Sequence, residues 1–217
     1  MKVGVLGTGM VGTAIATKLI DLGHEVRIGS RQAGNEKGTQ WVESAGDRAS
    51  SGDFADAASF GEIVFNCTAG EGSVDAVTSA REGLADKLLI DVANALDFSD
   101  GPPPVIAATD RECLAEQIQR AVPETRVVKS LNTVANDVMV DPARVPGDHV
   151  IFVSGDDQAA KRQAVELLGE FGWPEDRVID LGDITTARGS ETYVGLWLRL
   201  MAALDTTQFN IGLFRKS

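Results

Sequence analysis

The 217-residue chain has few of the side chains that form disulfides or bind metals, with only two cysteines and two histidines. Two cysteines cannot make a disulfide framework, and the spacing of Cys67 and Cys113 suggests no metal site. We therefore expect two unpaired thiols, as in a reducing cytoplasm. This scarcity excludes the small disulfide-rich class and gives no candidate metal ligands.

Long apolar runs and excess positive charge are also missing. No uninterrupted apolar stretch approaches ~18 residues, so we expect no membrane span. The N-terminus has no charged leader before an apolar segment, which argues against a signal peptide. The formal net charge of −12 argues against binding nucleic acid or an anionic membrane surface. These absences favour a cytoplasmic protein with a small-molecule partner.

Strand-like and helix-like segments alternate along the chain, which predicts an α/β fold with helices on both faces of a mainly parallel sheet. The predicted strands are Val3–Leu6, Glu25–Ile28, Arg48–Ser51, Ile63–Thr68, Leu88–Val92, Val127–Leu131, His149–Val153 and Val178–Leu181. The predicted helices are Met10–Leu22, Gly38–Ser44, Asp53–Phe60, Ser73–Leu84 (N-cap Ser73), Cys113–Arg120, Gln158–Phe171 and Thr192–Leu204. Asp97–Pro104 reads as a loop. We expect a Rossmann-type, doubly wound domain over residues 1–181 and a small C-terminal helical element over residues 182–217.

A glycine-rich turn follows the first strand and opens the first helix. In Gly7-Thr8-Gly9-Met10-Val11-Gly12, the first glycine permits a tight turn and the second lets a pyrophosphate approach the backbone. The third allows close packing of helix and strand, while the helix N-terminus offers free N–H groups to phosphates. The context favours dinucleotide binding; a purely structural turn is the alternative.

The end of the second strand lacks the acidic residue that holds the adenosine ribose in NAD-binding proteins, about 20 residues after the glycines. Ser30 and Arg31 stand there instead. A hydroxyl and a guanidinium suit a 2′-phosphate, which a carboxylate would repel. Lys37, expected in a flexible loop, adds a third candidate contact. The pattern predicts NADP(H); solvated roles for Arg31 and Lys37 are the alternatives.

Three further loops are expected at the carboxyl ends of the strands, where open α/β sheets bind ligands. The candidate cofactor contacts are Cys67, Thr68, Ala69, Ala93 and Asn94, and the candidate substrate contacts are Asn94, Asn132, Thr133 and Val134. Either asparagine could hydrogen-bond the nicotinamide carboxamide or a substrate carbonyl. Alternatively, both asparagines only tie their own turns.

No acid–base pair or nucleophile is evident. His24 and His149 are expected at the amino ends of strands, away from the ligand edge, and Tyr193 is expected to be a packing residue. Reduction of a carbonyl usually needs a positioned proton donor. Hydride transfer between two redox cofactors demands less, because the acceptor's ring system stabilises the charge. We therefore assign no catalytic side chain.

Five motifs resemble the NADP oxidoreductases that depend on the deazaflavin coenzyme F-420, whose fold recurs in the cytosolic domains of eukaryotic metalloreductases. They are Gly7–Gly12, His24–Arg31, Val128–Thr133, Gly182–Gly189 and Phe209–Gly212. The resemblance implies that Thr8, Gly9, Met10 and Val11 hold the pyrophosphate and that Ser30 and Arg31 hold the 2′-phosphate. It also implies a nicotinamide end lined by Thr68, Asn94, Ala135 and Ile211.

The resemblance further implies hydride transfer to a deazaflavin or flavin-type acceptor stacked on the nicotinamide. It implies a homodimer, which fits the apolar helix Thr192–Leu204. Two alternatives stay open: reduction of a small imine, a quinone or flavin-linked ferric iron, and a non-catalytic regulator that senses NADPH.

Replacing Arg31 tests the 2′-phosphate site. We expect Arg31→Ala to raise the Michaelis constant for NADPH and to change turnover less, because Arg31 would contact a group remote from the reacting ring. Steady-state kinetics with NADPH and with NADH measure this effect. A wild-type protein that used both cofactors equally well would contradict the roles given to Ser30 and Arg31.

Overall fold

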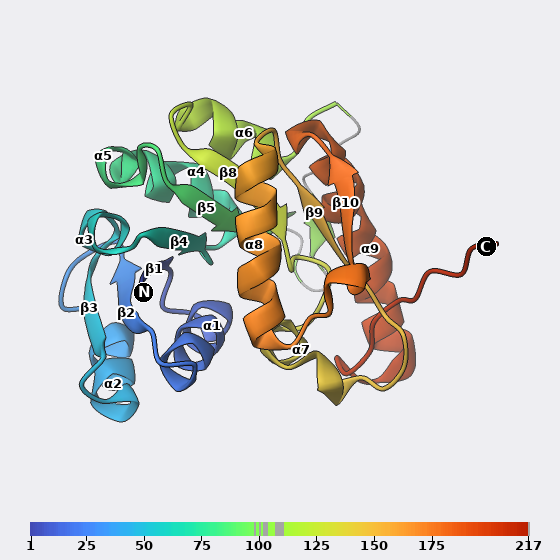
Figure 1. Cartoon of the computed structure of the whole chain (residues 1–217), viewed down its shortest axis with the longest axis horizontal. Helices are drawn as coiled ribbons and strands as arrows, with labels where there is room; N and C mark the ends of the chain where they lie inside the picture. Colours follow the sequence, from blue (N-terminus) through green and yellow to red (C-terminus); the bar gives the residue numbers. More distant parts are fainter. Residues whose placement is uncertain (98, 100, 102–103, 107–110, 217) are drawn as a thin grey trace.

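The computed structural model describes residues 1–97, 99, 101, 104–106 and 111–216 (Figure 1). One eight-stranded sheet has the order β10-β9-β8-β5-β4-β1-β2-β3. Its strands are β1 Lys2–Leu6, β2 Glu25–Ser30, β3 Ala49–Asp53, β4 Ile63–Asn66, β5 Leu88–Asp91, β8 Arg126–Ser130, β9 Ile151–Ser154 and β10 Val178–Gly182. A separate antiparallel pair joins β6 Leu96–Asp97 to β7 Val105–Ile106. The predicted Asp97–Pro104 loop falls partly outside the described residues.

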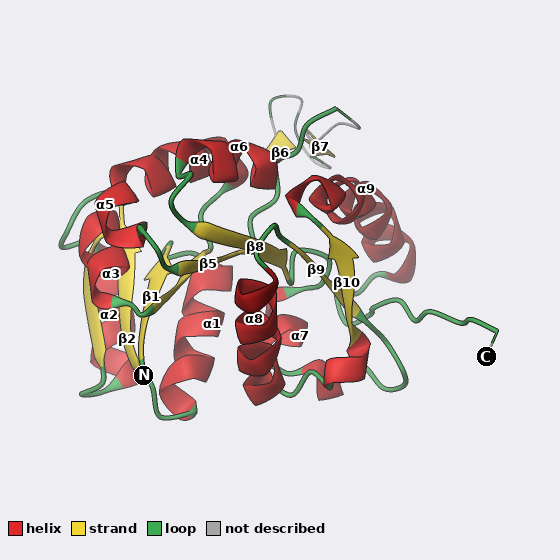
Figure 2. Ribbon diagram, turned by 45° about the horizontal axis from the view of Figure 1, so that its top comes forward, coloured by secondary structure: helices red, strands yellow, loops and turns green. Residues whose placement is uncertain are grey.

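Helices cover both faces of the sheet (Figure 2). They are α1 Met10–Asp21, α2 Glu36–Ala45, α3 Phe54–Phe60, α4 Gly70–Ser79, α5 Arg81–Leu84, α6 Leu114–Ala121, α7 Asn136–Val140, α8 Gln158–Phe171 and α9 Ala187–Leu204. The sheet and helices form two hydrophobic clusters. One contains side chains of α1, α2, α7 and α8, and the other contains side chains of α3 to α6 and α9. The predicted doubly wound, mainly parallel fold is confirmed.

The sheet is parallel from β3 to β8, and β9 then pairs antiparallel with β8. We expected His149 to lie far from the ligand edge because it precedes a strand. That expectation is wrong, since an antiparallel strand begins at the edge where its parallel neighbours end. Chain reversal at β9 therefore brings residues 149 and 150 to the carboxyl edge of the sheet.

Several helix boundaries differ from the sequence prediction. The helix predicted from Ser73 begins at Gly70, and buried Ser73 donates to the carbonyl of Ala69 at 3.2 Å instead of capping the helix. The last helix begins at Ala187, five residues before Thr192, because its polar first turns are buried against protein partners. Helix α7 was missed; five residues are too short to show a helical period.

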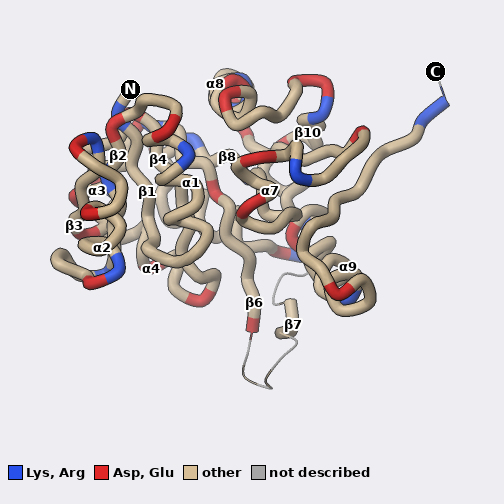
Figure 3. The backbone as a smooth tube through the Cα atoms, turned by 90° about the horizontal axis from the view of Figure 1, so that it is seen from below, with Lys and Arg blue, Asp and Glu red and all other residues tan. Residues whose placement is uncertain are grey.

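Charged residues do not divide the molecule into an acidic and a basic half; both signs are interspersed along the described chain (Figure 3). In that same part of the chain, no helix is both long and apolar enough to cross a bilayer.

The strand–turn–helix at the N-terminus depends on close backbone approach. Gly7 has a φ of +120°, which only glycine adopts without strain. A Cβ built on Gly12 would lie 2.1 Å from the carbonyl oxygen of Gly7, whereas one built on Gly9 would meet nothing within 4 Å. The third glycine thus packs helix against turn, and the second leaves space open above the turn.

Two alanine substitutions separate these roles. We expect Gly12→Ala to lower the free energy of unfolding by about 3 kcal/mol or more, because the methyl group overlaps backbone. Gly9→Ala should change stability little but weaken NADPH binding, because its methyl group occupies the open space. Urea unfolding and a binding titration measure both effects; equal stability of the two variants would contradict this packing.

Candidate functional site

The phosphate-binding turn has the features that a pyrophosphate needs. The Gly7 amide donates to the carbonyl of Gly29 at 2.8 Å and fixes the turn against β2. Helix α1 starts at Met10, which is 80% exposed. Its N-cap residue is Gly9, which has no side chain with which to cap the helix. The open first turn and its helix dipole therefore suit a phosphate group.

The candidate 2′-phosphate residues surround the end of β2. Arg31 is exposed, and a Cβ built on Gly72 would lie 3.9 Å from its guanidinium Nη2. The Ser30 hydroxyl donates to the carbonyl of Gln32 at 2.7 Å, so donation to a 2′-phosphate would require it to turn away from that carbonyl. These positions fit the predicted site, and the roles stay predictions.

Lys37 does not lie in a flexible loop as predicted, because the first turn of α2 contains it. Asn35 caps that helix by accepting a hydrogen bond from the Gly38 amide at 3.2 Å. The same Asn35 oxygen accepts from the Thr8 hydroxyl at 3.3 Å. This cap joins α2 to the phosphate-binding turn, a link the sequence pattern did not reveal.

The loops after β5 and β8 bind each other through their asparagines. The Asn94 amide donates to the backbone carbonyl of Asn132 at 2.8 Å, and the Asn132 amide donates to Asn94 Oδ1 at 3.0 Å and to the Ser190 carbonyl at 3.1 Å. Leu131 turns the chain here with a φ of +60°, outside the usual region for a branched residue. These bonds join different loops, whereas the alternative had each asparagine tying its own turn; ligand roles for both remain predictions.

The remaining candidates lie close to these loops in the chain. Cys67, Thr68 and Ala69 follow β4, and the Thr68 hydroxyl donates to Asn66 Oδ1 at 2.6 Å. A Cβ on Gly70 would lie 2.2 Å from the Asn94 carbonyl oxygen, so this loop touches the one that contains Ala93 and Asn94. Thr133, Val134 and Ala135 are buried between β8 and α7.

The C-terminal segment also reaches the carboxyl edge. The carbonyl of Ile211 accepts from the Val150 amide at 3.0 Å, and the Asn210 amide donates to the Val150 carbonyl and to His149 Nδ1, each at 2.9 Å. His149 Nε2 lies 3.1 and 3.0 Å from two further carbonyls, those of Pro142 and Val145. Both imidazole nitrogens are therefore occupied, and His149 is a structural residue.

A buried charge cluster lies beneath the three loops, and the sequence reasoning missed it. Lys129 Nζ lies 2.8 Å from Asp91 Oδ2 and 3.0 Å from Glu191 Oε1, and it also donates to the Ala93 carbonyl. The side chains of Lys129, Asp91 and Glu191 are at most 1% exposed. The signal available in the sequence was a charged residue, Asp91 or Lys129, near the carboxyl end of each of two strands rich in apolar residues.

Every charged atom of the cluster has partners. Asp91 Oδ1 accepts from Asn66 Nδ2 at 2.8 Å and from the Ala93 amide at 3.2 Å. Glu191 accepts from the Leu114 and Ala115 amides, each at 2.9 Å, at the start of α6. The cluster thus connects β4, β5, β8, α6 and α9.

Burial and charge act in opposite directions on the protons of the cluster. Burial by itself disfavours the ammonium of Lys129, but Asp91 and Glu191 outweigh it and the pKa of Lys129 is raised. Burial raises the pKa of Asp91, while Lys129 and Asn66 oppose that shift. Lys129 therefore holds its proton at neutral pH and is not an acid for catalysis.

Other reactive groups offer little chemistry. Burial raises the pKa of Cys113 to about 12 and raises that of Cys67 as well, so neither thiol ionises readily. Both cysteines are free, as predicted. The Tyr193 hydroxyl and Trp197 Nε1 are buried without a hydrogen-bond partner in the described chain. Among those same residues, no group of histidine, cysteine and carboxylate side chains could hold a metal ion.

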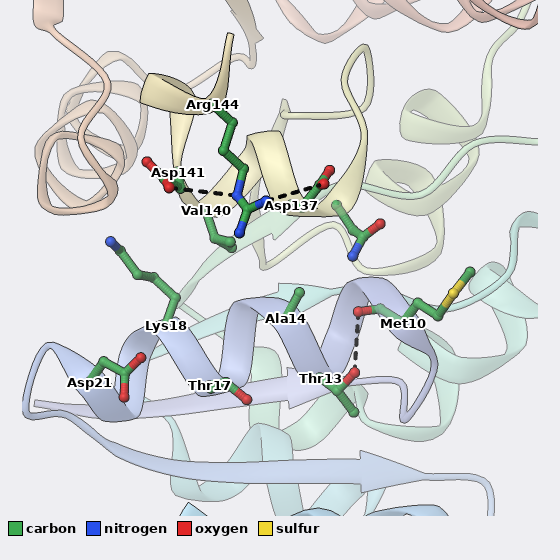
Figure 4. A pocket seen from close by; sticks show the side chains of 11 residues that line it. Met10, Thr13, Ala14, Thr17, Lys18, Asp21, Asp137, Val140, Asp141 and Arg144 are labelled. Atoms are coloured by element: carbon green, nitrogen blue, oxygen red, sulfur yellow. Dashed lines mark hydrogen bonds and ion pairs between the residues drawn. The ribbon is translucent and has the colours of Figure 1, made fainter. Parts of the chain in front are cut away.

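A groove runs along α1 opposite α7 (Figure 4). It starts at Met10 and ends at Asp21, and Arg144 lies over it with Asp137 at 3.8 Å and Asp141 at 3.5 Å. Of the predicted site residues only Met10 lines it, so the groove does not join the candidate site together.

Comparison with known proteins identifies the family. Residues 2–95 match the family described as NADP oxidoreductase, coenzyme F-420-dependent. Over 99% of this chain and 100% of the other, the sequence is 46% identical to a protein of Arthrobacter sp. FB24 with a TM-score of 0.92, provisionally assigned as an F-420-dependent NADP reductase. The chain belongs to the coenzyme F-420-dependent NADP oxidoreductase family. It is an NADP-dependent oxidoreductase.

More distant relatives agree with this membership. The F-420-dependent NADP reductase of Methanocaldococcus jannaschii is 26% identical over 92% of each chain. Metalloreductase STEAP3 of Rattus norvegicus is 28% identical over 98% of this chain, which spans only 40% of that protein's length. An imine reductase of Streptomyces aurantiacus, 18% identical with a TM-score of 0.68, shares the fold alone.

Removing Lys129 tests the buried cluster. We expect Lys129→Met to lower the free energy of unfolding by about 3–5 kcal/mol, because two buried carboxylates lose their cation. The control is Arg120→Met, which breaks an exposed pair with Glu112 and should cost at most about 1 kcal/mol. Denaturant unfolding measures the free energy of unfolding of both variants. An equal loss of that free energy in the two would show that the cluster contributes no more to stability than a surface pair.

Proposed function

We propose that this enzyme transfers a hydride between NADP(H) and coenzyme F-420 or another flavin-type acceptor bound beside the nicotinamide. The observation that carries the proposal is that polar side chains at and just below the carboxyl edge of the sheet already bind other protein groups. In the described chain His149, Asn94, Asn132 and Lys129 are all engaged with protein partners. A carbonyl reductase needs an available proton donor there, whereas an acceptor with its own conjugated ring needs less help.

In this proposal the protein acts mainly by positioning. The residues that would hold the phosphates are Gly7, Thr8, Gly9, Met10, Val11, Gly12, Ser30, Arg31 and Lys37. Those that would surround the nicotinamide and its partner are Cys67, Thr68, Ala69, Ala93, Asn94, Asn132, Thr133, Val134, Ala135 and Ile211. NADPH supplies the hydride, and holding the two rings at reacting distance provides most of the acceleration.

We also propose that residues 182–217 act as a cap and dimer element. Leu196 and Leu204 on α9 are each 55% exposed, which supports burial of this helix against a second copy. A cytoplasmic location also remains a prediction, consistent with two free thiols.

The test is stopped-flow absorbance with NADPH and oxidised coenzyme F-420, with FMN as a parallel acceptor. We expect the deazaflavin absorbance to disappear much faster than the flavin absorbance. Repeating the reaction with NADH provides the control for cofactor choice. Tight NADPH binding without turnover on either acceptor would contradict the proposal and favour a small imine or quinone substrate, or a sensor role.

A further inference from the structure

The buried cluster carries unequal numbers of positive and negative charges. It contains two carboxylates, Asp91 and Glu191, and one ammonium, Lys129, so its formal charge is −1 when all three are ionised. All three side chains are at most 1% exposed, and ions in solution therefore screen this charge poorly. A buried net charge acts over several ångströms on whatever binds above it.

The cluster lies directly behind the loops assigned to the nicotinamide. Lys129 Nζ binds the Ala93 carbonyl, and Asp91 Oδ1 accepts from the Ala93 amide at 3.2 Å. Through Asn66 the same carboxylate reaches Thr68, whose hydroxyl donates to Asn66 at 2.6 Å. The negative charge is thus coupled by hydrogen bonds to two of the three loops.

We propose that the Asp91–Lys129–Glu191 cluster sets the redox preference of the bound cofactor by favouring its oxidised form. The nicotinamide ring is a cation in NADP⁺ and neutral in NADPH, so a fixed negative charge stabilises the oxidised ring selectively. This inference rests on the placement of the nicotinamide in the proposed function. It makes these residues positioning and electrostatic groups rather than catalytic residues.

The proposal concerns the equilibrium of the enzyme-bound step and leaves the overall equilibrium in solution unchanged. A hydride with its electron pair leaves NADPH, which is oxidised to NADP⁺, and the acceptor takes the hydride together with one proton from solvent. The cluster neither gains nor loses a proton in this step. Because the product ring is the cation, the cluster favours hydride transfer from bound NADPH over hydride transfer to bound NADP⁺.

The measurement is the ratio of the dissociation constants for NADP⁺ and NADPH, determined by calorimetric titration of the full chain at pH 8. Asp91→Asn changes the formal charge of the cluster from −1 to 0. We expect that ratio to rise about fivefold in this variant, because NADP⁺ loses a charge interaction that NADPH lacks. Circular dichroism and thermal unfolding show whether the variant is folded.

A double variant separates charge from shape. Asp91→Leu with Lys129→Met removes one charge of each sign and leaves Glu191, whose carboxylate keeps the Leu114 and Ala115 amides as donors, with the formal charge of −1. We expect both cofactors to bind more weakly to it, with their ratio within about twofold of the wild type. If Asp91→Asn does not fold, Glu191→Gln makes the same change of charge at the other carboxylate.

The outcomes distinguish this inference from the proposed function. An unchanged ratio in Asp91→Asn or Glu191→Gln, or an equal rise in the double variant, would overturn the electrostatic role. The ratio is measured without any acceptor, so failure to reduce coenzyme F-420 would reject the proposed function and leave this test intact.

Discussion

The ion pair of Lys129 with Asp91 and Glu191 is the interaction on which the functional half of the molecule depends. It joins two central strands to the first turns of α6 and α9, and its outer hydrogen bonds reach the loops after β4 and β5. Ions buried this completely are stable only while each has its partners. The position of the C-terminal helix and the shape of the candidate nicotinamide end therefore depend on the same three charges.

The glycine turn depends on a different constraint, the close approach of backbone to backbone. Gly12 packs against the Gly7 carbonyl with no space for a side chain, while Gly9 leaves the space above the turn open. The Thr8–Asn35 contact then ties the N-terminus of α2 to this turn. One end of the site is thus shaped by missing side chains, and the other by buried charged ones.

Much of the architecture could be predicted because its signals are local. Apolar runs marked the central strands, and α8 was predicted with its observed limits, Gln158–Phe171. Predictions failed where local and tertiary signals differ. Ser73 resembles an N-cap but bonds back to Ala69 inside a helix, and the first turns of α9 look exposed although Glu191 is buried. The sequence pattern cannot show that a charged residue has a buried partner about forty or sixty positions away.

The sequence by itself determined the class of fold and predicted the preference for NADP(H), because the glycine turn and the Ser30–Arg31 pair are short, contiguous patterns beside neighbouring strands. Only the tertiary structure decided which polar residues meet. The reversal of β9 placed His149 at the ligand edge, and the strand order put Asp91 beside Lys129. These contacts depend on the direction of each strand and on which strands are neighbours. Both are set by the packing of the whole sheet and cannot be read from the sequence of any single segment.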